Sequence, residues 1–270
     1  MKLNVAAGWS KVWHNVVVPM AVRGGLRNGL YIPLDRAHLQ SRFGYDEEPA
    51  IKAAVDRIKR HTMTSFERLA SLWQQVRYLD RFDVPGAFVE CGVWKGGSTG
   101  LMALAHRATR AVPTRELHLF DSFEGLPEPD AVLDDQQSVD YAGAGGGELR
   151  SVGKCVGTLD ENRELMERLL GYPTDLLRYH VGWFQDTIPR DAPALGSIAL
   201  LRLDGDWYES TRICLEHLYD KVSRGGVVVI DDYGHYEGCR KAVDEFLQRR
   251  KEPVLLSHID YTGRYWIKPS

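Results

Sequence analysis

The chain contains two apolar runs that each end in aspartate, Ile198-Ala199-Leu200-Leu201-Arg202-Leu203-Asp204 and Val227-Val228-Val229-Ile230-Asp231-Asp232. Neither run alternates polar with apolar residues, which is typical of strands buried on both faces of a parallel sheet. Residues 209–224 between them are enough for one crossover helix. Such a strand–helix–strand unit makes the strands parallel. We therefore expect an α/β fold in which both carboxyl ends lie at the same edge of the sheet, where such folds bind ligands.

Asp204, Asp231 and Asp232 should lie close together at this edge. Three carboxylates can share so small a space only if they are protonated, solvated or bound to a cation. Carboxylate oxygens are ligands that suit Mg²⁺ or Ca²⁺. One aspartate after a strand is more often a turn former, but three at the same edge favour a metal site.

The composition is that of a globular protein with a packed core. The chain has 270 residues, of which 44% are hydrophobic, and its formal net charge of −3 argues against nucleic acid as a partner. The four cysteines form no CxxC pair, so we expect a reduced, cytoplasmic setting without a disulfide framework. The apolar run at residues 16–22 is interrupted by Pro19 and is too short to span a bilayer, so no membrane partner is expected.

Residues 1–60 lack a strand pattern and are expected to form an N-terminal, partly helical extension before one domain over residues 61–270. The extension would either cover a site as a lid or contact another subunit. We expect a homo-oligomer, either a dimer or a larger assembly. A firm helix should begin at Thr64, because Thr64 and Glu67 fit a capping box and apolar residues then recur at helical spacing.

A strand that ends in a glycine-rich turn is expected from Ala87 to Ser98, and a helix should follow it. Glycines in such a turn let the backbone approach a ligand closely at the N-terminus of the helix. The three glycines of this turn do not match the GxGxxG pattern. A tight turn without any ligand therefore fits the sequence equally well.

Asp121 ends the next expected strand, residues 116–120. An acid at this place binds the ribose diol in nucleotide-binding α/β folds, although a lone strand-end aspartate is more often a cap. Together with the glycine-rich turn, we interpret Asp121 as a ribose ligand. The pair Trp183-Phe184 follows a third strand and would either wall an apolar ring such as adenine or belong to the core. Residues 127–154 are acidic and then glycine-rich, and form either a mobile active-site flap or a disordered segment.

The C-terminal part of the chain predicts a helix at residues 238–248 and then a hairpin of two strands, residues 254–259 and 264–267. One strand of this hairpin must run antiparallel to the rest of the sheet. A parallel sheet that ends in such a hairpin is the architecture expected of Rossmann-like methyltransferases.

Five motifs that occur in order along the chain resemble the macrocin O-methyltransferase (TylF-like) family. They are Val89-Glu90-Cys91-Gly92-Val93-Trp94-Lys95-Gly96-Gly97-Ser98, Asp121-Ser122-Phe123-x-Gly125-Leu126-Pro127, Gly182-Trp183-Phe184-x-Asp186-Thr187-Ile188-Pro189, Asp204-Gly205-Asp206-x-Tyr208-Glu209-Ser210-Thr211 and Asp231-Asp232-Tyr233. The resemblance covers about residue 62 to the C-terminus. It implies a Rossmann-like class I methyltransferase fold, with a mainly parallel seven-stranded sheet and an antiparallel C-terminal strand. It also implies an S-adenosylmethionine- and Mg²⁺-dependent O-methyltransferase that acts on sugar hydroxyls of glycosylated natural products, as in antibiotic biosynthesis.

The resemblance further implies roles for individual residues. The methyl donor would be bound by Met63, Glu90, Gly92, Ser98, Asp121, Ser122, Trp183 and Phe184. Mg²⁺ would be held by Asp204, Asp231 and Asp232, and Asp204 would also be the catalytic base, with His235 as the alternative base. The small-molecule acceptor would contact Tyr45, Tyr233 and His235.

Two other functions are compatible with the same fold. One is a nucleotide-dependent oxidoreductase or epimerase, which is disfavoured because Glu90 in the glycine-rich turn would repel a pyrophosphate and no Tyr-x-x-x-Lys constellation is evident. The other is a non-catalytic partner subunit, which is disfavoured because a dead site has no reason to keep three mutually repelling carboxylates. A non-sugar diol such as a catechol is the alternative acceptor.

Overall fold

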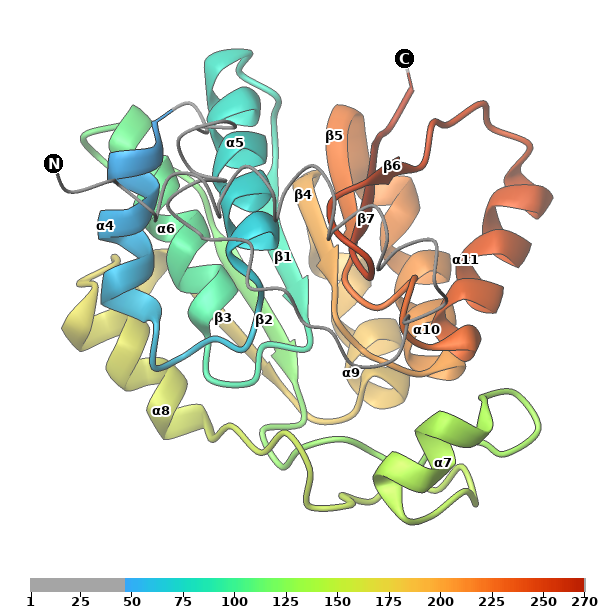
Figure 1. Ribbon diagram of the computed structural model, residues 1–270. Coiled ribbons are helices and arrows are strands. Elements are labelled where there is room, and N and C mark those ends of the chain that lie inside the picture. The colour runs from blue at the N-terminus through green and yellow to red at the C-terminus, as the bar shows by residue number, and fades with distance from the viewer. Residues whose placement is uncertain (1–46, 270) are drawn as a thin grey trace, which may run out of the picture. The chain divides into compact units, whose positions relative to one another are not determined.

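The computed structural model describes residues 47–269, which form a seven-stranded sheet with helices on both faces (Figure 1). The strands are β1 (Ala87–Cys91), β2 (Leu117–Asp121), β3 (Leu177–Val181), β4 (Ile198–Leu203), β5 (Val222–Ile230), β6 (Ser257–His258) and β7 (Arg264–Ile267). Their order is β3-β2-β1-β4-β5-β7-β6. Strands β1 to β5 are parallel, and β7 runs antiparallel to both β5 and β6. The predicted mainly parallel sheet with an antiparallel C-terminal strand is therefore confirmed.

The sheet separates two apolar cores. Helices α4 (Glu48–Ile58), α5 (Phe66–Arg81) and α6 (Gly97–Thr109) cover one face, and α9 (Phe184–Asp191), α10 (Tyr208–Leu218) and α11 (Glu237–Arg250) cover the other. Along β5, Val227 and Val229 face the first core while Val228 and Ile230 face the second. Because both faces are covered, both sets of side chains must be apolar, which explains why the strand sequences do not alternate.

The helix after residue 64 begins one residue later than predicted. Ser65 is the N-cap of α5, and its hydroxyl accepts a hydrogen bond from the backbone N–H of Arg68 at 3.2 Å. The predicted cap Thr64 is therefore wrong, since the Ser65 hydroxyl takes that role. The capping box at Thr158 is present, with Glu161 as its second member. The remaining short elements are α7 (Gln136–Ala142), α8 (Leu159–Arg163), the π-helix η2 (Glu164–Leu169) and the 3₁₀ turns η3 (Thr174–Leu176), η4 (Ala192–Ala194) and η5 (Tyr219–Lys221).

The strand order reverses between β1 and β4, which is the place where open α/β sheets bind ligands. The glycine-rich turn follows β1, and Asp204 follows β4. Gly92 has a φ of +88°, and a Cβ atom at this position would lie 1.8 Å from the carbonyl oxygen of Asp204. Glycine is therefore required to bring these two strand-end loops together.

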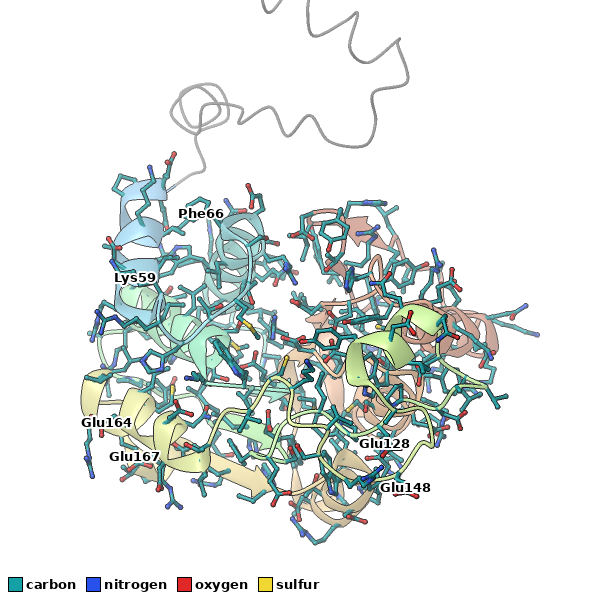
Figure 2. The ribbon with its side chains drawn as sticks, turned by 60° about the horizontal axis from the view of Figure 1, so that its bottom comes forward. Lys59, Phe66, Glu128, Glu148, Glu164 and Glu167 are labelled. Carbon is teal, nitrogen blue, oxygen red and sulfur yellow. The ribbon has the colours of Figure 1, made fainter. Side chains whose placement is uncertain are left out.

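Residues 127–157 form a long connection that we call the flap, and it lies beyond the carboxyl ends of the strands (Figure 1). It contains α7, whose N-cap Asp135 accepts a hydrogen bond from the backbone N–H of Ser138 at 2.8 Å. Glu128 and Glu148 lie side by side at its base, where the N–H of Glu128 donates to the carbonyl of Glu148 at 3.2 Å (Figure 2). These hydrogen bonds favour the active-site flap over the disordered segment, and the expected mobility of the flap stays a prediction.

Helix α4 packs against α5 and α6 and contributes Ile51 and Ile58 to the first core. The predicted boundary at residue 60 stays a prediction, because residues 1–46 lie outside the part of the chain that the structure describes. Within residues 47–269, every helix is too short or too polar to cross a bilayer.

Candidate active site

A pocket opens at the carboxyl edge of the sheet, where the order of the strands reverses. Its wall contains residues from the ends of four strands, among them Glu90, Asp121, Asp204 and Asp232. Most of the predicted site residues lie in this wall. Those that line the pocket are Met63, Glu90, Gly92, Ser98, Asp121, Ser122, Trp183, Phe184, Asp204, Asp231 and Asp232.

Three aspartates form an acidic cluster on one side of the pocket. A carboxylate oxygen from each of Asp204, Asp206 and Asp232 lies within 4.8 Å of the other two. Burial and then repulsion from Asp204 raise the pKa of Asp206 well above its usual value, and burial and repulsion from Asp206 do the same for Asp232. Such a set of mutually repelling carboxylates fits a hard divalent cation, which would relieve the repulsion.

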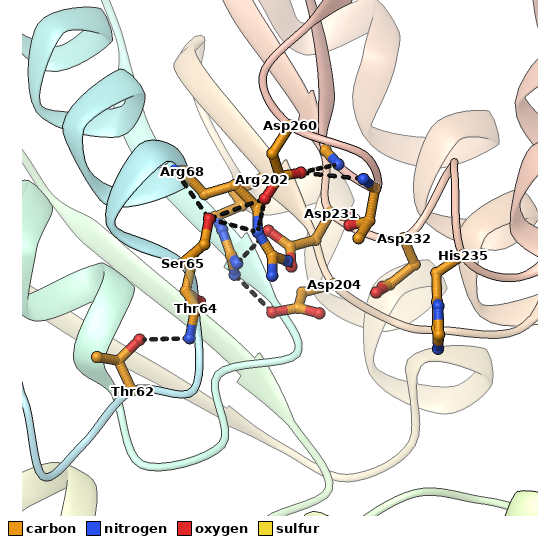
Figure 3. A network of polar contacts seen from close by, with 12 residues as sticks. Thr62, Thr64, Ser65, Arg68, Arg202, Asp204, Asp231, Asp232, His235 and Asp260 are labelled. Atoms are coloured by element: carbon orange, nitrogen blue, oxygen red, sulfur yellow. Dashed lines mark hydrogen bonds and ion pairs between the residues drawn. The ribbon is translucent and has the colours of Figure 1, made fainter. Parts of the chain in front are cut away.

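Asp231 faces a different set of partners from the other aspartates. Its Oδ1 accepts a hydrogen bond from Nη2 of Arg202 at 2.5 Å, and its Oδ2 forms an ion pair with Arg68 (Figure 3). Arg68 also bonds Asp260, with 3.0 Å between Nε and Oδ2. Burial raises the pKa of Asp231 to about 6, although Arg202 acts against this rise. The structure thus brings Asp204 and Asp232 together as predicted, but pairs the carboxylate of Asp231 with two guanidinium groups.

Glu90 is almost completely buried at the end of β1, with 1% of its side chain exposed. Its Oε1 accepts a hydrogen bond from Nη1 of Arg202 at 2.5 Å, and its Oε2 accepts one from the hydroxyl of Thr99. Burial raises the pKa of Glu90 to about 7, against the opposing effect of Arg202. The chain's own donors therefore satisfy both oxygens of this predicted donor-binding residue.

Asp121 closes the turn after β1 through its carboxylate. Its Oδ2 accepts from the backbone N–H groups of Val93 and Trp94 at 2.7 and 3.1 Å, and its Oδ1 accepts from that of Phe123 at 2.7 Å. Burial raises the pKa of Asp121 even though these backbone hydrogen bonds lower it. Asp121 thus acts as a cap, as the simpler interpretation holds, and at the same time lines the pocket where a ribose diol could donate to it.

Two of the three predicted acceptor residues, Tyr233 and His235, lie apart from this pocket. The hydroxyl of Tyr233 donates to Asp244 at 2.8 Å. The ring of His235 lies between the amide of Gln137 and the hydroxyl of Tyr261, at 3.1 and 3.2 Å from its two nitrogens. Neither Tyr233 nor His235 lines the pocket, and Tyr45 falls outside the described residues.

Three site residues were not singled out from the sequence: Asp206, Arg202 and Arg68. A signal for two of them is present. Asp206 follows Asp204 by two residues, and Arg202 is the single charged residue inside the apolar run of β4. A charged side chain in a strand buried on both faces needs partners of opposite charge. Arg68 has no such signal, because only the packing of α5 brings it to the pocket.

The chain matches the model of the macrocin-O-methyltransferase (TylF) family over residues 35–268. It belongs to this family. The match begins well before residue 62, so the family extends further towards the N-terminus than the motifs alone indicated. Membership makes the protein an O-methyltransferase, as predicted.

The chain is similar to relatives with named activities, two of which follow. 8-Demethyl-8-(2,3-dimethoxy-alpha-L-rhamnosyl)-tetracenomycin-C 4'-O-methyltransferase of Streptomyces olivaceus is 40% identical over 209 residues, which is 76% of this chain and 75% of the relative. Demethyldecarbamoylnovobiocin O-methyltransferase of Streptomyces niveus is 38% identical over 206 residues, with coverage of 76% and 75%. Among solved structures, the O-methyltransferase NovP matches with a TM-score of 0.67 and 32% identity, over 78% of this chain and 83% of NovP.

Proposed function

We propose that this protein transfers the methyl group of S-adenosylmethionine to a hydroxyl of a sugar on a glycosylated natural product, with a divalent cation, Mg²⁺, at the acidic cluster. Family membership and the rhamnosyl 4'-O position in the name of one relative support the reaction and the sugar. The observation that carries the proposal is the pocket itself. It has the acidic cluster Asp204, Asp206 and Asp232 on one side and the glycine-rich turn with Asp121 on the other.

The methyl donor fits the side of the pocket that contains the glycine-rich turn. S-adenosylmethionine carries a ribose diol but no phosphate, so it needs an acceptor such as Asp121 rather than a strict phosphate-binding fingerprint. Trp183 and Phe184 line the same pocket. Their aromatic side chains suit the adenine ring of the donor.

We build the cation site on Asp204 and Asp232, a choice that the strand pattern and the closeness of their carboxylate oxygens both support. A divalent cation bound there would supply positive charge that lowers the pKa of an acceptor hydroxyl. The third carboxylate is either Asp206, by proximity, or Asp231, by the family resemblance. Asp231 would serve only if its carboxylate turned away from Arg68 and Arg202.

Asp204 is the base that we assign to the reaction. A neutral sugar hydroxyl is a poor nucleophile, so its proton must leave as the oxygen–methyl bond forms and the sulfonium–methyl bond breaks. Asp204 Oδ2 is held by Arg202 at 2.8 Å, which orients the carboxylate while 29% of the side chain stays exposed. Alignment of the acceptor oxygen with the donor methyl group supplies much of the remaining rate.

Calorimetric titration of metal-stripped protein with S-adenosylmethionine tests the proposed donor. We expect micromolar binding, followed by Mg²⁺-dependent methylation when glycosylated acceptors are screened. No donor binding with or without Mg²⁺, together with binding of NAD(H), would contradict the proposal and favour an oxidoreductase.

The third cation ligand is identified by comparing two matched variants, Asp206→Asn and Asp231→Asn. Each removes one negative charge and preserves side-chain volume. Mutation of a group that only orients a metal ligand typically lowers metal affinity by about 10- to 100-fold. Loss of a direct ligand should therefore weaken Mg²⁺ binding at least about tenfold. The variant with the larger loss of Mg²⁺ affinity identifies the third ligand. If both variants bound Mg²⁺ as tightly as the unmodified protein, this would contradict a cation site built from three carboxylates.

A further inference from the structure

We propose that Arg202 couples the methyl-donor side of the pocket to the acidic cluster, so that each ligand raises the affinity of the other. This inference rests on the proposed function. Nη1 of Arg202 donates to Oε1 of Glu90 at 2.5 Å and to Oδ2 of Asp204 at 2.8 Å, and Nη2 donates to Oδ1 of Asp231 at 2.5 Å. One guanidinium group therefore holds carboxylates from the ends of three adjacent strands.

The sheet register makes this arrangement possible. Glu90 on β1 and Arg202 on β4 are paired across the two parallel strands, so their side chains point to the same face. Figure 3 shows Arg202 next to the carboxylates of Asp204 and Asp231, with Arg68 close to both Arg202 and Asp231. The guanidinium group is planar and its donors form a rigid fork, so a rotation that follows one carboxylate moves the donors away from the others.

Because Arg202 and two of its partners are buried, water cannot take the place of a carboxylate that moves away from the guanidinium group. The side chain of Arg202 is 2% exposed, and those of Glu90 and Asp231 are 1% and 5% exposed. A buried charge that loses its partner is costly, so these three groups have to move together. The outer oxygens of Glu90 and Asp231 are held in turn by Thr99 and Arg68.

Asp204 links the acidic cluster to Arg202, because it belongs to the cluster and also accepts a hydrogen bond from Arg202. It is the most exposed of the three carboxylates that Arg202 bonds, and it belongs to the acidic cluster. A cation at the cluster fixes Asp204, and through Arg202 it fixes Glu90 in the wall beside the donor. The ligand that binds first therefore holds Arg202 and its carboxylates in the geometry that the second ligand needs, which makes the cooperativity positive.

The experiment is calorimetric titration with S-adenosylmethionine in the absence and presence of saturating MgCl₂, and the reverse titration. For the unmodified protein we expect the donor dissociation constant to fall on the order of tenfold with Mg²⁺, and the Mg²⁺ constant to fall by the same factor with donor, as linkage requires. In Arg202→Lys the ratio should approach one, because lysine keeps the charge but cannot hold three carboxylates in a fixed geometry.

Arg115→Lys is the matched control. Arg115 is a partly buried arginine, with an ion pair to Asp80 at 2.8 Å and 11% of its side chain exposed, but it lies outside the pocket wall. It should retain the full tenfold ratio whatever its effect on stability. This control separates a loss of coupling from a general loss of packing.

The possible results are distinguishable. If donor and Mg²⁺ both bind the unmodified protein but neither changes the affinity of the other, the proposed role of Arg202 is overturned and the proposed function is not. This test uses the unmodified protein and so does not depend on the folding of any variant. Coupling that persists in Arg202→Lys would overturn it as well, since a purely electrostatic effect would then be sufficient. Absence of donor binding to the unmodified protein would overturn both the inference and the proposed function.

Discussion

Asp204 stands where β4 ends; its Oδ2 is bonded to Arg202, and one of its carboxylate oxygens lies within 4.8 Å of those of Asp206 and Asp232. At the scale of a single residue this is the position from which a carboxylate can both accept a proton and contribute to a cation site. The two roles need the same charge. A variant that removes the charge and retains the shape therefore tests them together.

We predict that Asp204→Asn lowers kcat by a factor on the order of 10² to 10⁴, the usual range for loss of a general base. The amide oxygen can still accept the hydrogen bond from Arg202, so the fold and the donor side of the pocket should persist. The measurement is initial-rate kinetics with an acceptor from the screen, combined with calorimetry of donor binding. Turnover within a fewfold of the unmodified protein would reject Asp204 as the base.

Some residues of the site could be predicted from the sequence, and others could not. Asp204 and Asp232 follow apolar strands directly, so the rule that parallel strands end at one edge locates them. Asp206 lies two residues further along, in a turn where its own φ is 57°, and only that turn directs it to the cluster. Arg68 is separated from Asp231 by 163 residues, and no local pattern connects them.

At the scale of elements, the flap is fastened to the two helices that begin next to the acidic cluster. Neither α10 nor α11 has a side-chain cap of its own. Instead, Asp134 of the flap accepts from the N–H of Tyr208 at 2.8 Å, and Asp135 accepts from the N–H of Glu237 at 2.6 Å. Two consecutive flap residues thus satisfy the exposed N–H groups at the start of both helices.

We predict that Gly238→Ala releases one side of the flap. A Cβ atom at Gly238 would lie 1.9 Å from Oδ1 of Asp134, so alanine displaces the carboxylate from the N-terminus of α10. Loss of that cap costs about 1 kcal/mol, which the higher helix propensity of alanine roughly offsets. Global stability should therefore change little, while amide hydrogen exchange in residues 127–157 becomes at least several times faster by mass spectrometry.

Gly196→Ala is the control for this experiment, since a Cβ atom there meets nothing within 4 Å. It should leave exchange in the flap unchanged. Unchanged exchange in Gly238→Ala would show that Asp135 and the other contacts are sufficient to hold the flap. The hydrogen bond from the indole N–H of Trp207 to the carbonyl of Pro127, at 3.0 Å, is one such contact.

The elements themselves were predictable where hydrophobic periodicity specifies them. Strands β1, β2 and β4 and helix α11 lie close to their expected residues, because burial on a sheet face or a helix face determines each pattern. Strand β5 begins at Val222, five residues before the expected run 227–230. The cap at Ser65 and the π-helical turn of η2 were not predictable in this way. The course of the flap depends on Asp134 and Asp135 meeting helices that are distant in sequence, which no local signal specifies.

At the scale of the whole molecule, one polar cluster lies far from the active site and links stability to pH. His118 on β2 is 7% exposed, and its Nδ1 lies 3.0 Å from Nε2 of His180 on β3. His180 in turn bonds Asp191 at 2.7 Å. Burial, and then the neighbouring His180, lower the pKa of His118 to about 4, against the opposing charge of Glu116.

The lowered pKa means that the unfolded chain binds a proton at His118 between about pH 6.5 and pH 4 while the folded protein does not. The corresponding stability is complete above about pH 6.5 and is lost as the pH falls towards 4. We predict that the free energy of unfolding decreases by roughly 2 kcal/mol between pH 7 and pH 5 on account of this residue. Urea unfolding of the unmodified protein and of His118→Gln at both pH values measures this contribution as the difference between the two proteins.

His118→Gln should remove this contribution, because glutamine keeps a polar group in the site but does not titrate. Exposed His217 on α10 provides the matched variant, His217→Gln, which should preserve the slope of the unmodified protein. If His118→Gln retained the full slope, the pH dependence would have to arise elsewhere.

The carboxylates with raised pKa at the active site would act in the opposite direction, since the folded protein holds their protons more tightly than the unfolded chain does. Saturating Mg²⁺ during the measurement would remove part of that opposing contribution, so the loss assigned to His118 should stand out more clearly with the cation than without it.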